Sequence, residues 1–136
     1  MSLFKIFDLS GSALSAQSVR LNTVASNMAN ADVASSTPEG AYRARYPVFA
    51  AALDAASAGQ TAGVRVAGIV ESPAAPRAEY MPGHPLANED GYVFFPAVNV
   101  VEQMTDMISA SRSYQGNAEI MNTVKQLLLR TLQLGR

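Results

Sequence analysis

The sequence predicts an α+β protein in which long N- and C-terminal helices pair in a coiled-coil-like layer, with a small middle segment that contains a β-hairpin. Two observations carry this prediction. All seven prolines lie within residues 38–96, and proline interrupts helices because it lacks an amide donor and clashes with the preceding turn. Apolar residues also repeat at seven-residue intervals in both proline-free ends. We therefore expect helical ends and a non-helical middle.

These signals divide the chain into two parts. We expect a helical assembly domain formed jointly by residues 1–31 and 97–136, and a middle β/loop domain over residues 32–96. Charge follows the same division, because the middle carries four arginines against seven acidic residues, whereas each end has a small positive excess. The chain has no tryptophan and only 7% aromatic residues, so few large side chains are available and we expect a thin core.

The N-terminal helix is predicted from four apolar residues spaced seven apart, which is the spacing of a coiled-coil contact stripe. Asparagines interrupt this segment although asparagine is a mediocre helix former. We expect Asn22 to flank the stripe and to hydrogen-bond to an adjacent helix. Asn27 and Asn30 lie where the helix must end, and asparagine tolerates the left-handed conformation of a helix cap. The stripe consists of Phe7, Leu14, Leu21 and Met28.

The middle segment contains short runs typical of strands, with β-branched and aromatic residues between clusters of turn residues. Residues 82–91 are dense in turn residues, with two prolines, two glycines, one asparagine and one aspartate, and predict a turn. The small residues of the stretch 50–63 predict a mobile loop. Together these runs predict a small antiparallel sheet or hairpin. The candidate strands are residues 42–49, 63–72, 77–81 and 91–96.

The C-terminal helix is expected to begin just after Pro96, because Asn99 and Glu102 have the spacing of a capping box. From there to Leu134 is about 35 residues, or roughly 50 Å of helix, too long to be wrapped inside a compact globule of this size. Gly116 is tolerated in such a helix or marks a close backbone approach. One apolar stripe is Met107, Tyr114, Met121 and Leu128, and the other contains Met104, Ser111, Ala118 and Leu132.

The residue content argues against most other classes of function. The chain has one histidine, His84, and no cysteine, so we expect no catalytic residue, no metal site and no cofactor. A formal net charge of −1 offers no basic face for nucleic acid. No apolar run reaches the roughly 20 residues of a membrane span, and Asp8 interrupts the only run near the start before it reaches signal-peptide length. We therefore expect no membrane insertion and no cleaved signal peptide.

Self-assembly is the function that the two helical ends favour. Burying a large apolar side chain contributes about 1.5–3 kcal/mol, and a long helix that reaches beyond a shorter partner leaves part of its stripe uncovered. Exposed apolar stripes call for neighbouring subunits. We expect the stripes to carry the packing of the two helices against each other and against neighbours. The predicted interface is Phe7, Leu14, Leu21, Asn22, Met28, Met104, Met107, Tyr114, Met121, Leu128 and Leu132.

Four stretches resemble a known family, the axial proteins of the bacterial flagellum. Residues 21–33, "LNTVASNMANADV", resemble the N-terminal signature of rod and hook proteins, and residues 98–135 look like the family's C-terminal segment. Residues 82–100, "PGHPLANEDGYVFFPAVNV", and the opening residues 1–17 are similar to the corresponding segments of proximal rod subunits in particular. The chain departs from the usual pattern at Met28, Ala97 and Gly116.

This resemblance implies a non-enzymatic structural subunit of the rod, the drive shaft that transmits torque across the periplasm. It implies as partners other copies of the chain, other rod proteins, the flagellar export apparatus and components of the membrane ring. Export would proceed through the flagellar type III apparatus without a cleaved signal, placing the chain in the basal body. Two alternatives stay open at this point: a different rod subunit, and a non-flagellar coiled-coil adaptor in the cytoplasm.

Overall fold

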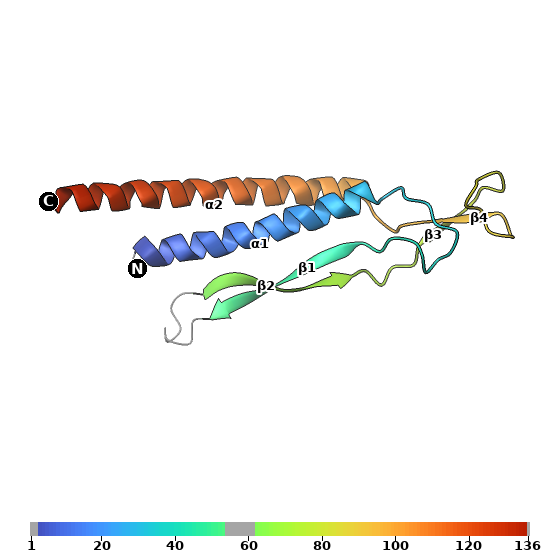
Figure 1. The fold of residues 1–136 in the computed structure, drawn as a ribbon, viewed down its shortest axis with the longest axis horizontal. Coiled ribbons are helices and arrows are strands. Elements are labelled where there is room, and N and C mark those ends of the chain that lie inside the picture. Colours follow the sequence, from blue (N-terminus) through green and yellow to red (C-terminus); the bar gives the residue numbers. More distant parts are fainter. Residues whose placement is uncertain (1–2, 54–61, 136) are drawn as a thin grey trace.

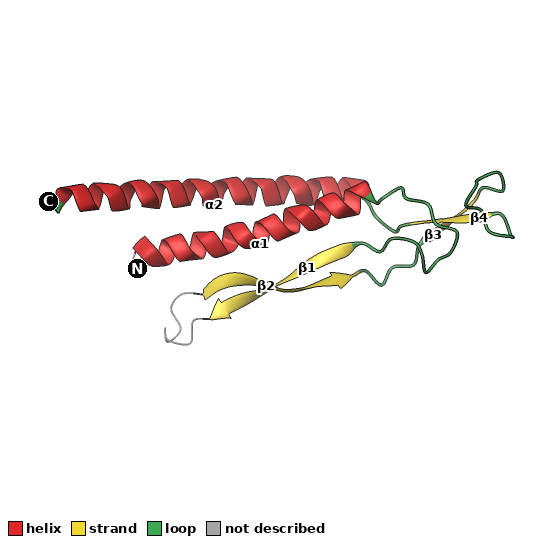
Figure 2. Ribbon diagram, in the orientation of Figure 1, coloured by secondary structure: helices red, strands yellow, loops and turns green. Residues whose placement is uncertain are grey.

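The computed structural model describes residues 3–53 and 62–135, which form an elongated α+β molecule. Helix α1 lies between helix α2 and the β1–β2 hairpin, and a second hairpin, β3–β4, lies beyond the helix ends (Figure 1). Helices and strands are thus separated into layers rather than mixed (Figure 2). The predicted α+β class is confirmed. The elements are α1 Leu3–Ala29, β1 Arg45–Leu53, β2 Ala62–Glu71, β3 Arg77–Tyr80, β4 Tyr92–Phe95 and α2 Val100–Leu134.

The two helices run antiparallel, and α2 starts at the predicted cap. The Asn99 side chain accepts hydrogen bonds from the backbone amides of Val101 at 3.1 Å and Glu102 at 3.3 Å, which satisfies two amides that have no partner within the helix. Helix α2 contains 35 residues against 27 in α1. Its C-terminal end therefore reaches beyond the start of α1 (Figure 1).

Strands β1 and β2 form an antiparallel hairpin that packs along α1. The prediction of a loop over residues 50–63 is wrong at both ends of that range, because β1 continues to Leu53 and β2 begins at Ala62. Small residues permit this pairing close to the helix. A Cβ on Gly63 would lie 3.0 Å from Ser12 Oγ, and Val64 N donates to that oxygen at 3.2 Å. The rest of the predicted loop, residues 54–61, lies outside the described residues.

Strands β3 and β4 form a second two-stranded sheet, so the strands do not join in a single sheet. The turn between them is held by Asn88 Oδ1, which accepts from the amides of Asp90 at 3.1 Å and Tyr92 at 2.8 Å. Gly91 has a φ of 82°, a conformation that glycine adopts without strain. Ser35 pairs with Phe94 through two backbone hydrogen bonds of 2.8 and 2.9 Å, which ties this hairpin to the segment that follows α1.

The core is thin, as the composition predicts. Its buried apolar residues are all alanines and valines apart from Pro96, and two of the largest fully buried side chains are the polar Gln103 and Asn27. Such a core supplies less burial of apolar surface than a core of large side chains. Polar contacts between elements therefore carry an unusual share of the specificity of this fold.

Gly116 of α2 provides a test of whether the helix needs a glycine. A Cβ at this position would meet no atom within 4 Å, so no close approach within the described chain requires it. Gly116→Ala is expected to raise the free energy of unfolding by about 0.5–1 kcal/mol, because glycine loses more backbone entropy in a helix than alanine. Urea unfolding followed by circular dichroism measures this change, and a destabilised variant would contradict the account.

Candidate assembly site

Both helices carry large apolar side chains that the described chain leaves exposed. On α1, Phe4 is 68% exposed. Scattered apolar residues are normal on protein surfaces, but repeated large ones along one helix mark contact with another protein. These side chains make the helical layer the candidate assembly site. On α2 the exposed residues are Val100, Val101, Met104, Ile108, Tyr114, Ile120, Leu127, Leu129, Leu132 and Leu134.

The residues of the predicted interface fall into two groups in the structure. Those of the first group are half-buried, and those of the second are exposed and free to meet a neighbour. The interface that both groups would form with neighbouring subunits stays a prediction. The half-buried residues are Leu14, Leu21, Met28, Met107, Met121 and Leu128, and the exposed residues are Phe7, Asn22, Met104, Tyr114 and Leu132.

The most buried positions of the two helices are not the predicted apolar stripes. In α2 the buried residues Gln103, Ala110 and Val124 are separated by multiples of seven, and in α1 Ser10 and Val24 are 14 apart. The heptad spacing is therefore present, but it falls three residues later than the stripes that contain Leu21 and Met107, and one residue earlier than the second α2 stripe, which contains Met104. Gln103 carries an amide and Ser10 and Ala110 carry small side chains, whereas the larger stripe residues Leu14, Leu21, Met107 and Met121 are only half-buried. The spacing of apolar residues alone does not predict these buried positions, because Ser10 and Gln103 are polar.

Asn27 of α1 joins three elements and is fully buried. Its Nδ2 donates to Gln103 Oε1 of α2 at 2.9 Å and to the carbonyl oxygen of Arg45 in β1 at 2.8 Å. Its Oδ1 accepts from Arg45 N and from the Tyr42 hydroxyl, each at 2.8 Å. Both donor and both acceptor positions of the amide are thus used. Asn27 fixes the helix pair and the β1–β2 hairpin relative to one another.

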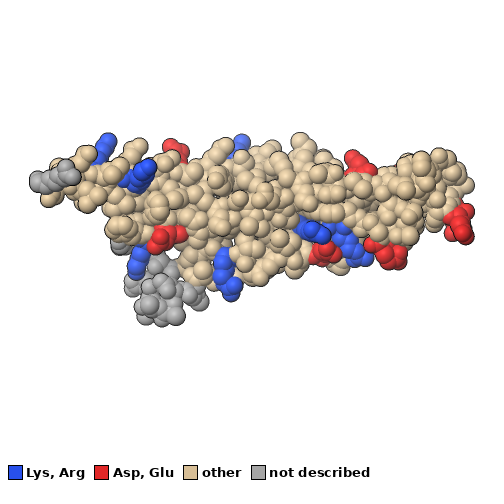
Figure 3. Space-filling view, viewed as in Figure 1, with Lys and Arg blue, Asp and Glu red and all other residues tan. Residues whose placement is uncertain are grey.

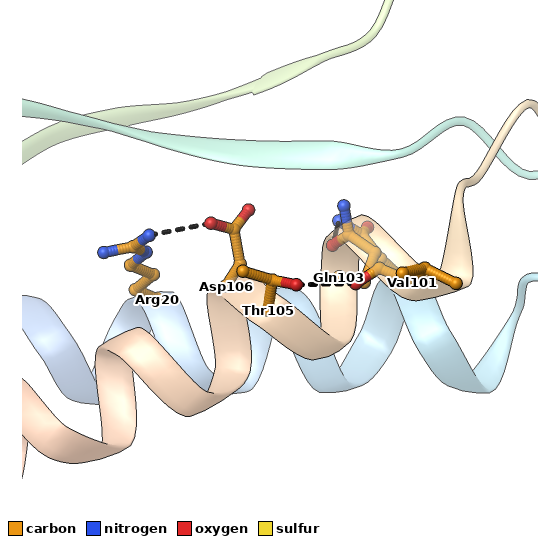
Figure 4. A network of polar contacts seen from close by, with 6 residues as sticks. Arg20, Val101, Gln103, Thr105 and Asp106 are labelled. Atoms are coloured by element: carbon orange, nitrogen blue, oxygen red, sulfur yellow. Dashed lines mark hydrogen bonds and ion pairs between the residues drawn. The ribbon is translucent and has the colours of Figure 1, made fainter.

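An ion pair supports the same helix contact. Arg20 Nη2 of α1 lies 2.9 Å from Asp106 Oδ1 of α2, and the two side chains are 26% and 36% exposed. Figure 4 shows Arg20 reaching across to Asp106 one turn from Gln103. Because both groups are partly solvated, the pair contributes modestly to stability. Its main effect is to set the register of the two helices.

The other two asparagines have different roles. Asn22 is exposed and lines a groove between α1 and the hairpin, beside Arg45 and Ile69. Its expected bond to a neighbouring helix stays a prediction. Asn30 Nδ2 donates to the Ser26 carbonyl oxygen at 2.8 Å. Among the described residues, only glycine has a positive φ. The prediction of a left-handed helix cap at Asn27 or Asn30 is therefore wrong. Both asparagines instead use their side-chain amides to form hydrogen bonds.

His84 takes part in local structure. Its Nδ1 accepts a hydrogen bond from the amide of Leu86 at 3.1 Å within the β3–β4 turn.

The described part of the chain contains no group of three or more histidine, cysteine or acidic residues placed to hold a metal ion. None of its helices combines the length and apolarity needed to cross a membrane. Basic and acidic side chains are interspersed on the face shown in Figure 3, with acidic ones at the β3–β4 end.

Comparisons with known proteins match both helical ends. A family described as flagella basal body rod protein matches residues 7–34. A family described as flagellar basal body rod FlgEFG protein C-terminal matches residues 89–134. The paired terminal helices and these matches define the class: the chain is a structural subunit of the flagellar basal-body rod.

Relatives identify the family within this class. The chain is 52% identical to the flagellar basal-body rod protein FlgC of Salmonella typhimurium and 54% identical to that of Yersinia enterocolitica, over the full length of both chains in each case. It is 38% identical to FlgC of Buchnera aphidicola from Acyrthosiphon pisum, over 98% of each chain. The chain belongs to the FlgC family. This confirms the resemblance and sets aside both the different rod subunit and the cytoplasmic adaptor.

Proposed function

We propose that this rod subunit forms part of the proximal rod and transmits torque across the periplasm through its terminal helices. The observation that carries the proposal is the row of exposed apolar side chains on α2, including Met104, Ile108 and Leu132. Packing of these residues against neighbours would distribute torque over many helix contacts at once. Residues 1–31 and 97–136 form the assembly domain in this proposal, and residues 32–96 form an outer layer.

Rigidity within the subunit supports this role. Torque is passed on only if the elements of a subunit keep their relative positions. The Asn27 hydrogen bonds join α1, α2 and β1, and the pair Arg20–Asp106 joins the helices one turn away. Because the apolar core is thin, these polar contacts are the features that favour a rigid subunit.

The proposal includes export and further partners. The chain would leave the cytoplasm through the flagellar type III apparatus without losing an N-terminal signal, and it would contact the membrane ring, other rod proteins and its own copies. In a strain with an inactivated type III apparatus, the chain should stay in the cytoplasm. Its intact mass there should equal its intact mass in basal bodies of the parent strain. A shorter chain in basal bodies would contradict export without cleavage.

A further inference from the structure

The contact between α1 and α2 contains a part that repeats along the helix and a part that does not. Three buried residues of α2, among them Gln103, are separated by multiples of seven residues. Sliding α2 by seven residues, about 10 Å along its axis, would bring residues of the same row against α1 again. Heptad patterns leave the register open unless a polar residue marks one position. Here Asn27 bonds to Gln103, and Arg20 pairs with Asp106 (Figure 4).

Both polar contacts are lost when α2 slides along α1. A displacement by seven residues would place Ala110 opposite Asn27 and Ser113 opposite Arg20. An alanine side chain has no acceptor, and serine carries no charge. Because Asn27 is fully buried, its unpaired amide hydrogen would carry a desolvation cost. The observed register satisfies both Asn27 and Arg20.

The rest of α2 offers no second position of this kind. The two contacts need an acceptor and, three residues later, a carboxylate, which is the spacing of Gln103 and Asp106. The other two acidic residues of α2 follow Asn99 and Gly116 by three residues. Glycine has no side-chain acceptor, and Asn99 Oδ1 already accepts from the first amides of the helix.

A second α1 helix is a poor partner for α1. Within α1 the one acidic residue is Asp8. In an antiparallel pair of α1 helices, Asp8 opposite Arg20 would put Lys5 opposite Asn27, and a lysine ammonium has no acceptor. In a parallel pair at the same level, Arg20 would face its own copy, and like charges repel. Neither arrangement satisfies Arg20 and Asn27 together.

We infer that Asn27 and Arg20 select the helix that pairs with α1, an inference that rests on the proposed function because neighbouring subunits then bring competing helices alongside. Apolar side chains attract any helix with a similar stripe. The two polar residues accept an antiparallel helix that presents an acceptor and, three residues later, a carboxylate. They thereby favour α2 in the observed register over a displaced α2 and over a second α1.

Exchanging the charges of the ion pair between two chains tests this selection. The chain has no cysteine, so Ala16→Cys in one chain and Ala110→Cys in another supply the only thiols. Both alanines are buried, and each lies four residues from Arg20 or Asp106 in opposite directions, so we expect them to face each other across the antiparallel helices.

The Ala16→Cys chain also carries Arg20→Asp, and the Ala110→Cys chain carries Asp106→Arg. Like charges then face each other within each chain, whereas opposite charges meet between the chains. In flagellated cells that make both, the disulfide-linked pair should exceed that of the two cysteine chains without charge exchanges by about threefold or more. An equal yield would overturn the inference.

A second ion pair provides the matched control. Arg77 and Glu79 lie 3.4 Å apart in β3 and are 55% and 39% exposed. With Arg77→Glu in one cysteine chain and Glu79→Arg in the other, the yield should stay within about twofold of the unexchanged chains. An increase equal to that of the helix exchange would overturn the inference, because it would not depend on the helix contact.

The amide contact is tested in a single chain that carries both cysteines. Gln103→Leu removes the acceptor of Asn27, and the ratio of interchain to intrachain disulfide should rise by about twofold or more. Gln115→Leu is the control, since Gln115 is an exposed residue of the same helix, and it should leave that ratio unchanged. Equal ratios for the two variants would overturn the role of the amide.

One further chain keeps the test decisive if the singly exchanged chains are degraded. A chain with both cysteines and both Arg20→Asp and Asp106→Arg should form the intrachain disulfide within about twofold of the level without the exchanges. Failure of this chain would overturn the inference. Absence of the unsubstituted chain from basal bodies would refute the proposed function itself, whereas unchanged pairing in chains that reach basal bodies would refute only the selection.

Discussion

Replacing Asn27 with alanine is expected to lower the free energy of unfolding by about 2–4 kcal/mol. Alanine removes four hydrogen bonds of 2.8–2.9 Å in a site with no exposure to solvent. It leaves Gln103 Oε1 and both backbone groups of Arg45 without their partner. Buried polar groups that lose a partner cost more than the bond itself contributes. The loss should also loosen the β1–β2 hairpin from α1.

Urea unfolding followed by circular dichroism measures this effect, with Asn22→Ala as the matched control. Asn22 lies in the same helix but is exposed, so its replacement should change the free energy of unfolding by no more than about 0.5 kcal/mol. Asn27→Asp should also destabilise the chain, because a carboxylate has no hydrogen to donate to Gln103 Oε1 or to the Arg45 carbonyl. Equal stability of Asn27→Ala and Asn22→Ala would show that the Asn27 contacts do not hold the elements together.

Replacing Leu21 with aspartate is expected to abolish rod formation while the chain is still synthesised. Leu21 is half-buried in α1, three residues before the buried Val24, on the stripe predicted to pack against α2 and against neighbouring subunits. A charge there removes the apolar contribution of about 1.5–3 kcal/mol at each copy. It also leaves a carboxylate to be desolvated at every contact. Because the proposed contact would repeat between subunits, assembly should fail rather than weaken slightly.

Immunoblotting measures synthesis of the variant, and electron microscopy of basal bodies with a swimming assay measures assembly. Ser15→Asp is the matched control, since Ser15 is an exposed residue of the same helix and lies off the stripe. The control strain should swim. Normal hooks and basal bodies in the Leu21→Asp strain would show that this stripe does not face a neighbour.

Much of the fold follows from local signals in the sequence. The confinement of proline to residues 38–96 predicts where helices are excluded, and Asn99 with Glu102 predicts where α2 begins. These features act through the backbone of their own segment, so a single sequence displays them. The strand ends within residues 50–63 are not predictable in the same way. Alanine and glycine are weak strand formers, and the contact of β2 with Ser12 of α1, distant in the sequence, favours their pairing.

The centre of the helix contact could not be predicted because it depends on pairs of distant residues. Heptad spacing predicts an apolar stripe in α1 and two in α2, but nothing local shows that Gln103 is buried or that its oxygen meets Asn27, 76 residues away in the sequence. From the neighbouring sequence alone, an asparagine in a helix is interpreted as a weak helix former or as a helix cap. Its actual role follows from four partners on three other segments, which only the folded chain brings together.

The central claim is that this chain is a component of the flagellar rod, assembled through α1 and α2. The most direct test is mass spectrometry of basal bodies purified from the cell that makes the chain. We expect peptides from both terminal helices and from the middle segment, in amounts comparable with those of other rod subunits. The chain should disappear from the same fraction when it carries Leu21→Asp. Basal bodies that contain a complete rod but no peptide of this chain would contradict the account.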